Sequence, residues 1–569
     1  MNGAKKHRWI LTLVFSLLTV GIFWMGIYVG HVGERNRTRG MLNKMAQNVE
    51  HNSIDVEAYA QELAALENYL ANSDKLLLTI SYIRNMYVDH IAMDSLYDRV
   101  IPLLLSELDP HSEYIPARYF SEVNESLEGE FDGIGIVFNA LTDTITVLNV
   151  IPQGPSDKAG VRPGDRILFI DDRSVAGQGI PQDSMMKLMR GPRGSHVKLS
   201  VERSGIDRLV DIDVERDAIE INSIETAFML DKSAGVGFVR LSQFARTSHE
   251  ELVEAIAKLE EEGLQSLIID LRGNGGGYLD QAILITNEFL PANKLIVYTE
   301  DRYGLQQREY SRGFGGSTEL PLAILVDESS ASSSEILAGA IQDNDRGLVI
   351  GRRTFGKGLV QAQLPFVDGS ALRLTVARYY TPTGRSIQKP YTPGDGLGYY
   401  MEILDRYNHN EFFSADSIHF DESMKFTTPG GRTVYGGGGI MPDIFMPLDT
   451  LGITPYYNEV WNSNVLYRYT MDFTDRHREE LSAAESLDDL DHILGSTDLI
   501  KEFTAYAERN GVATNSEELA TSHDIILAQI RAYISRNALN DEAGFYYNIY
   551  PIDATLQRAV EELRRQTAK

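Results

Sequence analysis

The sequence of 569 residues contains no cysteine. This absence excludes a disulfide framework, a thiolate nucleophile and a cysteine-ligated metal site. An excess of positive charge is also missing, because 53 Lys and Arg stand against 81 Asp and Glu, a net charge of -28. Nucleic acid is bound by basic surfaces, so we expect no nucleic-acid partner. The chain is too long for one hydrophobic core, and we expect three or four domains.

Long hydrophobic runs are absent, with one exception near the N-terminus. Trp9 to Gly30 is a stretch of 22 residues without a charged side chain. As a helix it would be about 33 Å long, enough to cross a bilayer. A cleaved signal peptide is the alternative, but its apolar region would normally be shorter and end in a small-x-small site, which 27–30 does not provide. We therefore predict a single, uncleaved transmembrane helix at 9–30 and a polar stalk at 31–72.

The rest of the chain changes character several times. Helical spacing of apolar residues comes first, followed by strand-like runs between Gly/Pro turns, then by strands that alternate with helices, and finally by an acidic helical stretch. The fold class expected is multidomain, α/β and α+β. The predicted divisions are a helical domain at 73–120, a small β-rich module at 121–216, an α/β core at 217–390, an insertion at 391–435, a return to the core at 436–450 and a helical C-terminal domain at 451–569.

Histidine, the usual base for a serine nucleophile, is absent between His249 and His409. This interval contains S-S-A-S-S-S-E-I at 329–336, directly after an apolar strand. One serine suffices to cap a helix, so we interpret another as a nucleophile. Lys357, between two glycines in an apolar stretch, is the candidate base, because burial would lower its pKa. A histidine from elsewhere in the sequence remains an alternative.

Two further features fit a serine nucleophile. Gln361 would share the face of Lys357 in an extended segment, where it could hold the amine without charging it. Gly275-Gly276-Gly277 follows another buried strand and could offer backbone amides to an oxyanion. A glycine triplet is more often only a turn, and a single lysine is more often a surface charge. The catalytic interpretation is favoured because all the pieces follow strands of one α/β unit, where such sheets place their sites.

The chain resembles the carboxy-terminal processing peptidases, serine proteases with a Ser–Lys dyad and a PDZ domain. The resemblance covers roughly 73–390 and resumes near 435–447. It rests on six motifs in order: L-D-P-H-S-E-Y at 108–114, F-D-G-I-G-I at 131–136, A-G-V-R-P-G-D at 159–165, D-L-R-G-N-G-G-G at 270–277, S-A-S-S-S-E-I at 330–336 and T-F-G-K-G-L-V-Q at 354–361.

This resemblance implies a role for each matching residue. Ser332 would be the nucleophile, Lys357 the general base and Gln361 its partner. The oxyanion would be bound by the amides of Gly276 or Gly277 and of Ser333, a position where the family usually has alanine. The family also implies a crotonase-like core and a PDZ domain in 121–216. The Gly133-Ile134-Gly135 turn could offer backbone amides to the terminal carboxylate of a peptide that adds as a strand, although such turns are more often only turns. We expect no metal and no cofactor.

We therefore predict a membrane-anchored endopeptidase that takes protein or peptide substrates with free C-termini. Arginines follow the apolar span, so charge does not choose its orientation. The predicted function places the span in a bacterial inner membrane and the catalytic part in the periplasm. The insertion and the C-terminal helical region depart from the family pattern, and either could gate access or bind a second copy or a regulatory partner. The rival functions are a binding scaffold with an inactive protease fold and a crotonase-like acyl-CoA enzyme.

Overall fold

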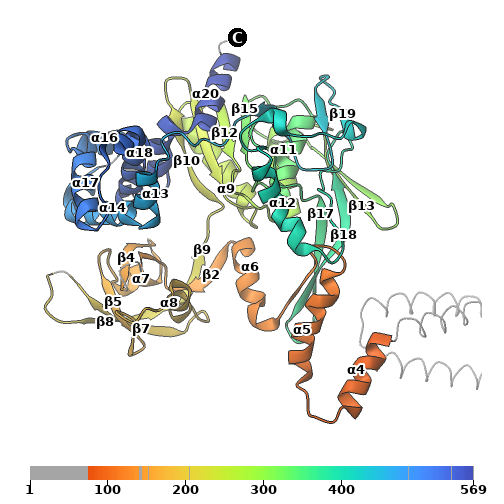
Figure 1. The fold of residues 1–569 in the computed structure, drawn as a ribbon, viewed down its shortest axis with the longest axis horizontal. Coiled ribbons are helices and arrows are strands. Elements are labelled where there is room, and N and C mark those ends of the chain that lie inside the picture. Colours follow the sequence, from red (N-terminus) through yellow and green to blue (C-terminus); the bar gives the residue numbers. More distant parts are fainter. Residues whose placement is uncertain are drawn as a thin grey trace, which may run out of the picture. The chain divides into compact units, whose positions relative to one another are not determined.

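The computed structural model describes residues 75–567 except 140–143, 152, 204, 485 and 540. Two compact units divide the chain, one ending at Tyr97 and the other beginning at Asp98, and each is described by itself (Figure 1). The predicted transmembrane helix at 9–30 and stalk at 31–72 lie outside the described residues. Among the residues described, no helix has the length and apolar content needed to cross a membrane.

The first unit contains α4 (Lys75–Met86) and the beginning of α5 (Met93–Ser106), in line with the helical spacing of its sequence. The second unit begins differently from the helical domain predicted at 73–120. β1 (Glu113–Ile115) pairs antiparallel with β18 (Ala371–Tyr380), so this segment adds a strand to a distant sheet. In this pairing Ile115 lies opposite Ala371 and is buried.

A five-strand path with one side strand forms the β-rich module, in the order β3-β4-β5-β7-β8 with β6 beside β5. Its core contains alternate residues of these strands, including Ile145 and Val147. The strands are β3 (Ile136–Asn139), β4 (Ile145–Val150), β5 (Arg166–Ile170), β6 (Arg173–Ser174), β7 (His196–Glu202) and β8 (Val210–Glu215), with α7 (Pro155–Ala159) and α8 (Gln182–Met189). At its entrance and exit, α6 (Phe120–Glu128) leads into β2 (Glu130–Gly133), which pairs with β9 (Asp217–Glu220).

A six-stranded sheet in the order β10-β11-β12-β15-β16-β21 forms the α/β core. All its pairs are parallel except β10 with β11. The strands are β10 (Ile224–Asp231), β11 (Val236–Leu241), β12 (Ser266–Asp270), β15 (Leu322–Val326), β16 (Leu348–Gly351) and β21 (Ile444–Phe445). A second sheet contains β1, β13 (Leu295–Asp301), β14 (Gln306–Tyr310), β17 (Leu359–Pro365) and β18.

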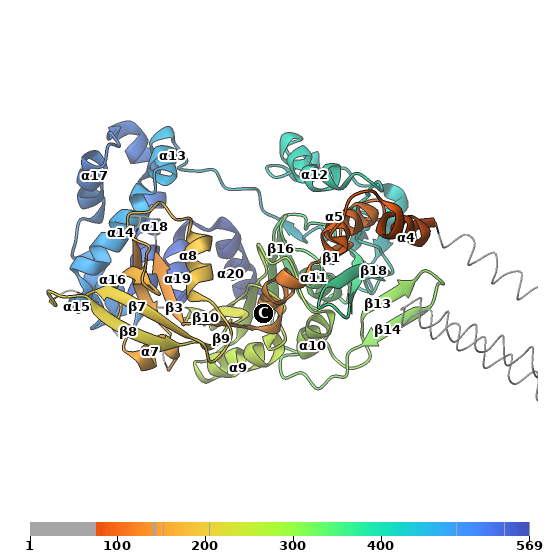
Figure 2. The same cartoon turned by 90° about the horizontal axis from the view of Figure 1, so that it is seen from below.

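Both faces of the six-stranded sheet are buried, because its strands are apolar at successive positions. Leu267 and Ile269 of β12 belong to a cluster formed with α9 (Ser248–Glu261), α10 (Leu279–Phe289) and α11 (Ser333–Asp343). These three helices are labelled in Figure 2. Ile268 faces the opposite side, where it packs with residues of α20 (Ala554–Thr567). The second face is thus covered by the end of the C-terminal region, across β12 and β15 (Figure 1).

The C-terminal region is helical but has two parts. Its first part forms a bundle with a core of its own, built from α13 (Pro455–Asn462), α14 (Val465–Arg476), α15 (Arg478–Leu481), α16 (Leu487–Gly495), α17 (Leu499–Arg509) and α18 (Ser516–Leu539). The second part, α19 (Ala543–Ile549), η4 (Tyr550–Ile552) and α20, packs on the sheet instead.

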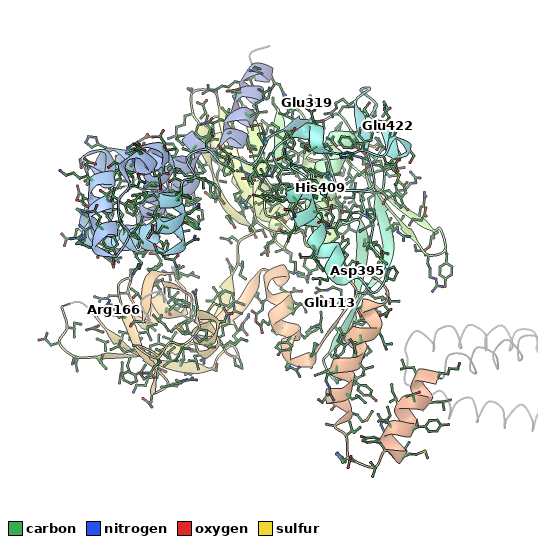
Figure 3. All side chains as sticks on the ribbon, in the orientation of Figure 1. Glu113, Arg166, Glu319, Asp395, His409 and Glu422 are labelled. Carbon is green, nitrogen blue, oxygen red and sulfur yellow. The ribbon has the colours of Figure 1, made fainter. Side chains whose placement is uncertain are left out.

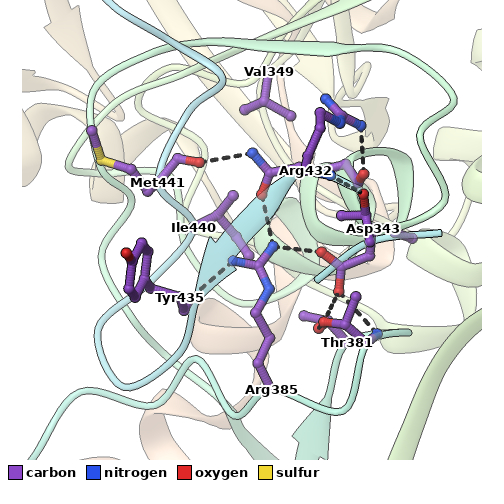
Figure 4. Close-up of polar contacts among 12 residues, drawn as sticks. Asp343, Val349, Thr381, Arg385, Arg432, Tyr435, Ile440 and Met441 are labelled. Atoms are coloured by element: carbon purple, nitrogen blue, oxygen red, sulfur yellow. Dashed lines mark hydrogen bonds and ion pairs between the residues drawn. The ribbon is translucent and has the colours of Figure 1, made fainter. Parts of the chain in front are cut away.

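The insertion contains α12 (Gly396–Asn408), the short turns η2 (Ala415–Ser417) and η3 (Glu422–Met424), and the hairpin β19 (Lys425–Thr427) and β20 (Thr433–Tyr435). The fully buried Arg385 fixes its end to α11: the guanidinium donates to Asp343, Gln342 and the carbonyl of Tyr435 (Figure 4). β21 then pairs with β16, so the chain re-enters the core sheet.

Candidate active site

Ser332 lies in a sharp turn between β15 and α11, at the carboxyl end of a central strand. Its φ of 56° and ψ of -113° are unusual for a residue with a side chain. Such strain is costly and is found where a turn must present one side chain, as in the strand–turn–helix elbows of serine hydrolases.

The neighbouring serines connect this turn to the glycine-rich segment. Ser330 Oγ donates to the carbonyl of Leu271 at 2.8 Å and Ser334 Oγ to that of Asn274 at 2.9 Å. Ser333 Oγ donates to the carbonyl of Gly277 at 3.0 Å. The serine-rich stretch therefore has a structural explanation at three positions, each of which holds the segment 271–277 beside Ser332.

The glycines are required by the close approach of these two segments. A Cβ atom at Gly276 would lie 2.8 Å from Ser332 Cβ and 3.0 Å from the amide nitrogen of Ser333. At Gly277, with φ of 150°, a Cβ atom would lie 2.2 Å from the carbonyl oxygen of Phe244. The amide of Gly276 donates to Asn274 Oδ1 at 2.8 Å. Of the two glycines predicted to bind the oxyanion, Gly276 is therefore the one whose amide already has an acceptor.

Lys357 lies on the loop between β16 and β17 and is partly buried. Its Nζ donates to Gln361 Oε1 at 3.2 Å, and Gln361 Nε2 donates to the carbonyl of His111 at 2.5 Å. Burial lowers the pKa of Lys357, and the Arg373 guanidinium lowers it further. The structure thus brings Lys357 and Gln361 together in a setting that favours the neutral amine.

Glu335 connects the serine turn to the lysine loop. One carboxylate oxygen, Oε2, accepts from the amide of Ser332 at 2.9 Å and from the amide of Lys357 at 2.8 Å. The other, Oε1, accepts from Thr354 Oγ1 at 2.5 Å and from the amide of Gly356 at 2.8 Å. The main chains at 332 and 357 therefore meet at one oxygen atom, although 25 positions separate them in the sequence.

Tyr379 makes the same connection from β18. Its hydroxyl contacts the carbonyl oxygens of both Ser332, at 3.1 Å, and Lys357, at 2.5 Å. Glu335 and Tyr379 are buried. Burial raises the pKa of Glu335 to about 7, against the opposing effect of its four hydrogen bonds. Sequence reasoning assigned no role to Tyr379, Glu335 or His111; the S-x-x-E spacing from Ser332 was the available signal for Glu335.

The Gly133-Ile134-Gly135 turn begins at the last residue of β2 and leads into β3. The carbonyl of Ile134 accepts from the amide of Ser156, and that of Gly135 from the amide of Ile151. Gly135 has a φ of 70°, which favours glycine. β3 is an edge strand of its sheet, so a peptide could add beside it.

Comparisons with known proteins identify two parts of the chain. Residues 235–395 match the family described as Peptidase family S41, and 133–214 match the PDZ domain. A carboxy-terminal-processing protease of Bartonella bacilliformis is 38% identical over 346 residues, which span 60% of this chain and 76% of that relative. The chain belongs to the carboxy-terminal processing proteases. Membership confirms the predicted enzyme class, a serine-type peptidase, together with its PDZ domain.

Other members of the carboxy-terminal processing proteases are similar over comparable spans. The protease CtpA of Bacillus subtilis is 33% identical over 317 residues, 56% of this chain and 66% of that protein. The solved photosystem II D1 C-terminal processing protease is 25% identical, covers 66% of this chain and 87% of its own, and has a TM-score of 0.36. The helical bundle is matched separately: 456–540 correspond to a family of unknown function, DUF8443. The insertion beyond 395 lies outside all three matched ranges.

Proposed function

We propose that the protein is a Ser–Lys endopeptidase in which Ser332 attacks the peptide bond and Lys357 is the general base. The observation that carries this proposal is the shared anchorage of the two residues on Glu335 and Tyr379. Two loops held at the same atoms can keep a hydroxyl and an amine in one constant relation, which proton transfer requires.

In the proposed reaction, neutral Lys357 Nζ takes the proton of Ser332 Oγ as this oxygen attacks the scissile carbonyl carbon. The tetrahedral oxyanion is bound by the amides of Gly277 and Ser333, since the amide of Gly276 is engaged by Asn274. The C–N bond breaks, and the Lys357 ammonium returns the proton to the leaving amine. Water, deprotonated by the same amine, then attacks the acyl carbon. The ester C–O bond breaks, and the Lys357 ammonium returns the proton to Ser332 Oγ. Gln361 Oε1 holds one N–H of the amine, so that its lone pair can face the serine.

A fluorophosphonate probe, which reacts with activated serines, tests this assignment directly. We expect it to label Ser332 of the wild-type protein, as mapped by peptide mass spectrometry. Ser332→Ala should lose the label and about 10⁴-fold or more of peptidase activity. Ser329→Ala is the matched control, because Ser329 is an exposed serine of the same turn. Full peptidase activity in Ser332→Ala would exclude the proposed nucleophile.

The base is tested by Lys357→Arg, which keeps a positive charge but cannot supply a neutral base. We expect it to be as inactive as Lys357→Ala. If neither variant lost activity, another residue would have to be the base. If the wild-type protein bound peptides but neither cleaved them nor reacted with the probe, the binding scaffold with an inactive protease fold would be the better description.

The C-terminus of the substrate is proposed to bind at the Gly133-Ile134-Gly135 turn, with the peptide added to β3. The edge position of β3 and the PDZ match of this module support this proposal. Peptides with a free C-terminal carboxylate should bind at least about tenfold more tightly than their amidated forms, because the amide removes the charge that the turn would receive. Equal affinities by fluorescence anisotropy would exclude this recognition.

We also propose that 9–30 anchors the enzyme in a bacterial inner membrane, with the catalytic part in the periplasm, where it processes or degrades envelope proteins. The uncharged 22-residue stretch supports the anchor. Release of the full-length protein from membranes by alkali would contradict it, and protection from protease added to spheroplasts would contradict the orientation. A role for the C-terminal region in binding a second copy or a regulatory partner stays a prediction.

A further inference from the structure

The beginning of the insertion reaches the Lys357 loop through one side chain, Tyr399 of α12. Asp395, labelled in Figure 3, caps this helix by accepting from the amide of Gly398 at 2.9 Å. Tyr399 is only 4% exposed, whereas its helix neighbours Leu397 and Tyr400 are 76% and 51% exposed. The helix therefore turns this one aromatic ring inward.

The Tyr399 hydroxyl meets His111 of the L-D-P-H-S motif. The hydroxyl oxygen lies 3.0 Å from His111 Nε2, and the two rings contact edge to face with centroids 5.1 Å apart. Gln388 Nε2 donates to the same hydroxyl at 3.3 Å. Because the oxygen accepts from Gln388, its own proton is available for His111 Nε2, and burial raises the pKa of Tyr399 so that the proton is kept.

The main chain of His111 continues this chain of contacts to the base. Its carbonyl oxygen accepts from Gln361 Nε2, and this bond orients the amide so that Gln361 Oε1 faces Lys357 Nζ. If His111 moved, the amide of Gln361 could rotate and present an N–H group to the amine. The position of His111 therefore bears on whether Lys357 has an acceptor for one of its protons.

Tyr399 also contacts residues that hold the lysine loop on both sides of Lys357. Gln388, which donates to the Tyr399 hydroxyl, accepts from the amide of Gly358 at 2.8 Å. Lys389, whose Nζ lies 4.2 Å from the Tyr399 ring centroid, donates its amide to the carbonyl of Gly356 at 2.9 Å. Tyr399 therefore contacts the residues that bind the loop at Gly356, just before Lys357, and at Gly358, just after it. It also acts on Lys357 through His111 and Gln361.

We propose that Tyr399 is a positioning residue for the Lys357 base, acting through His111 and Gln361. The inference rests on the proposed function of Lys357. Peptidase family S41 is matched only up to 395, so Tyr399 comes from a part of the chain that this match does not include. Its chemistry suits the task, because every side chain in this connection is neutral. Burial is the largest cause that lowers the pKa of His111 to about 4, against the opposing charge of Asp109, so the imidazole is uncharged near pH 7.

Charged neighbours and burial together determine how the pKa of Lys357 should change when the Tyr399–His111 contact is removed. Arg373 favours the neutral amine, whereas Glu113, Glu335 and Asp109 favour the ammonium. Loss of the Tyr399 bond would loosen the loop and admit water to the amine, which reduces the desolvation that lowers its pKa. The acidic limb of the kcat/KM profile, where activity rises as Lys357 loses its proton, should then move to higher pH.

The test compares Tyr399→Phe with Tyr407→Phe. Both variants lose a tyrosine hydroxyl from α12, but Tyr407 is 48% exposed and its hydroxyl makes no hydrogen bond within the described residues. Rates are expressed per active site titrated with the fluorophosphonate probe, so that any unfolded fraction is not counted. We expect Tyr399→Phe to lower kcat/KM about 10-fold or more near neutral pH, mainly through kcat, and to move the acidic limb of the kcat/KM profile upward. Tyr407→Phe should change neither.

His111→Phe checks the same connection from its other end. It should reproduce the shift of the acidic limb, and the double variant with Tyr399→Phe should lose little more than either single one, because both remove the same contact. An unshifted limb in Tyr399→Phe, or additive losses in the double variant, would overturn the proposal even if kcat/KM fell. Lys357→Ala, measured alongside, separates the two failures: if it stays active, the proposed base is wrong, and if it alone is inactive, only the role of Tyr399 is wrong.

Discussion

The insertion and the end of the C-terminal region both contact catalytic segments, but they do so with opposite chemistry. Tyr399 reaches Gln361, the hydrogen-bond partner of Lys357 Nζ, through the neutral side chain and the main chain of His111. From the C-terminal side, Asp553 forms an ion pair of 2.8 Å with Arg272, the third residue of the D-L-R-G-N-G-G-G motif. Arg272 also pairs with the buried Asp270 at 2.7 Å, and Arg240 pairs with the same carboxylate at 3.0 Å.

The difference follows from what each segment has to do. In the proposed mechanism a carboxylate at Lys357 Nζ would stabilise the ammonium form and remove the base, so that mechanism needs neutral partners there. Behind the glycine-rich segment no group has to change its protonation state, and charges can be paired. Burial alone would raise the pKa of Asp270, but the two guanidinium groups lower it overall, so this carboxylate is ionised. In this region the ion pairs only have to hold the glycine-rich segment in place.

Glu335 is the exception, because it is a carboxylate that accepts hydrogen bonds from the main chain of the lysine loop. Of the variants that test the comparison between the two regions, Glu335→Gln should have the largest effect. Its two oxygens accept from four donors, and an amide NH₂ in place of one oxygen would leave two of them unsatisfied. The expected cost is about 2–6 kcal/mol of stability. Urea unfolding followed by fluorescence would measure it, with the exposed Glu319→Gln as control (Figure 3).

The cost of Glu335→Gln should also depend on pH. The folded-state pKa of about 7 lies above the ordinary value of 4.5, so the folded protein holds this proton more tightly than the unfolded chain. The stability that this provides is fully present below pH 4.5 and is lost as the pH rises to about 7. The difference between wild type and variant should therefore be larger at pH 5 than at pH 8. A difference that increased with pH would show that the glutamate is stabilised in its ionised form.

Gln361→Glu puts a carboxylate where the comparison requires a neutral group. An opposite charge at this distance should raise the pKa of Lys357 by about 1–3 units, which lowers the rate near neutral pH by roughly 10–10³-fold and is reversed at higher pH. The variant also loses the bond to the His111 carbonyl. Gln178→Glu adds the same charge to an exposed position of the β-rich module and should have little effect on the pH profile of kcat/KM. Unchanged activity of Gln361→Glu at pH 7 would contradict the neutral-base mechanism.

Asp553→Asn should have the smallest effect, because Arg272 keeps Asp270 as a partner. We expect a loss of about 1–2 kcal/mol in stability and a few-fold decrease in kcat, without a shift of the acidic limb. Asp475→Asn is the control, since it breaks an ion pair with Arg478 in which both side chains are at least 40% exposed. Such exposed pairs contribute at most about 1 kcal/mol. If Asp553→Asn shifted the acidic limb of the kcat/KM profile, the ion pairs at the glycine-rich segment would also influence the pKa of the base. The proposed difference between the two regions would then be wrong.

Local sequence patterns were enough to predict the enzyme class and to select the residues proposed for the site. The strand followed by S-S-A-S-S-S-E-I and the glycine triplet after another strand describe short segments whose conformations depend mostly on their own residues. Lys357 and Gln361 are four positions apart on one loop and strand, and the structure joins them as this spacing suggested. The family and its PDZ domain followed from the same short motifs.

Only the tertiary structure decided what holds these pieces in place. His111 and Gln361 are 250 positions apart, and Arg272 and Asp553 are further apart still, so no periodicity or spacing in the sequence relates them. They meet because β1 completes the second sheet and because the two-sided apolar strands of the core require a cover, which α19 and α20 provide. The sequence by itself determined the enzyme class and the groups that are proposed to react. Long-range burial determined which of them are held together, and with what charge around them.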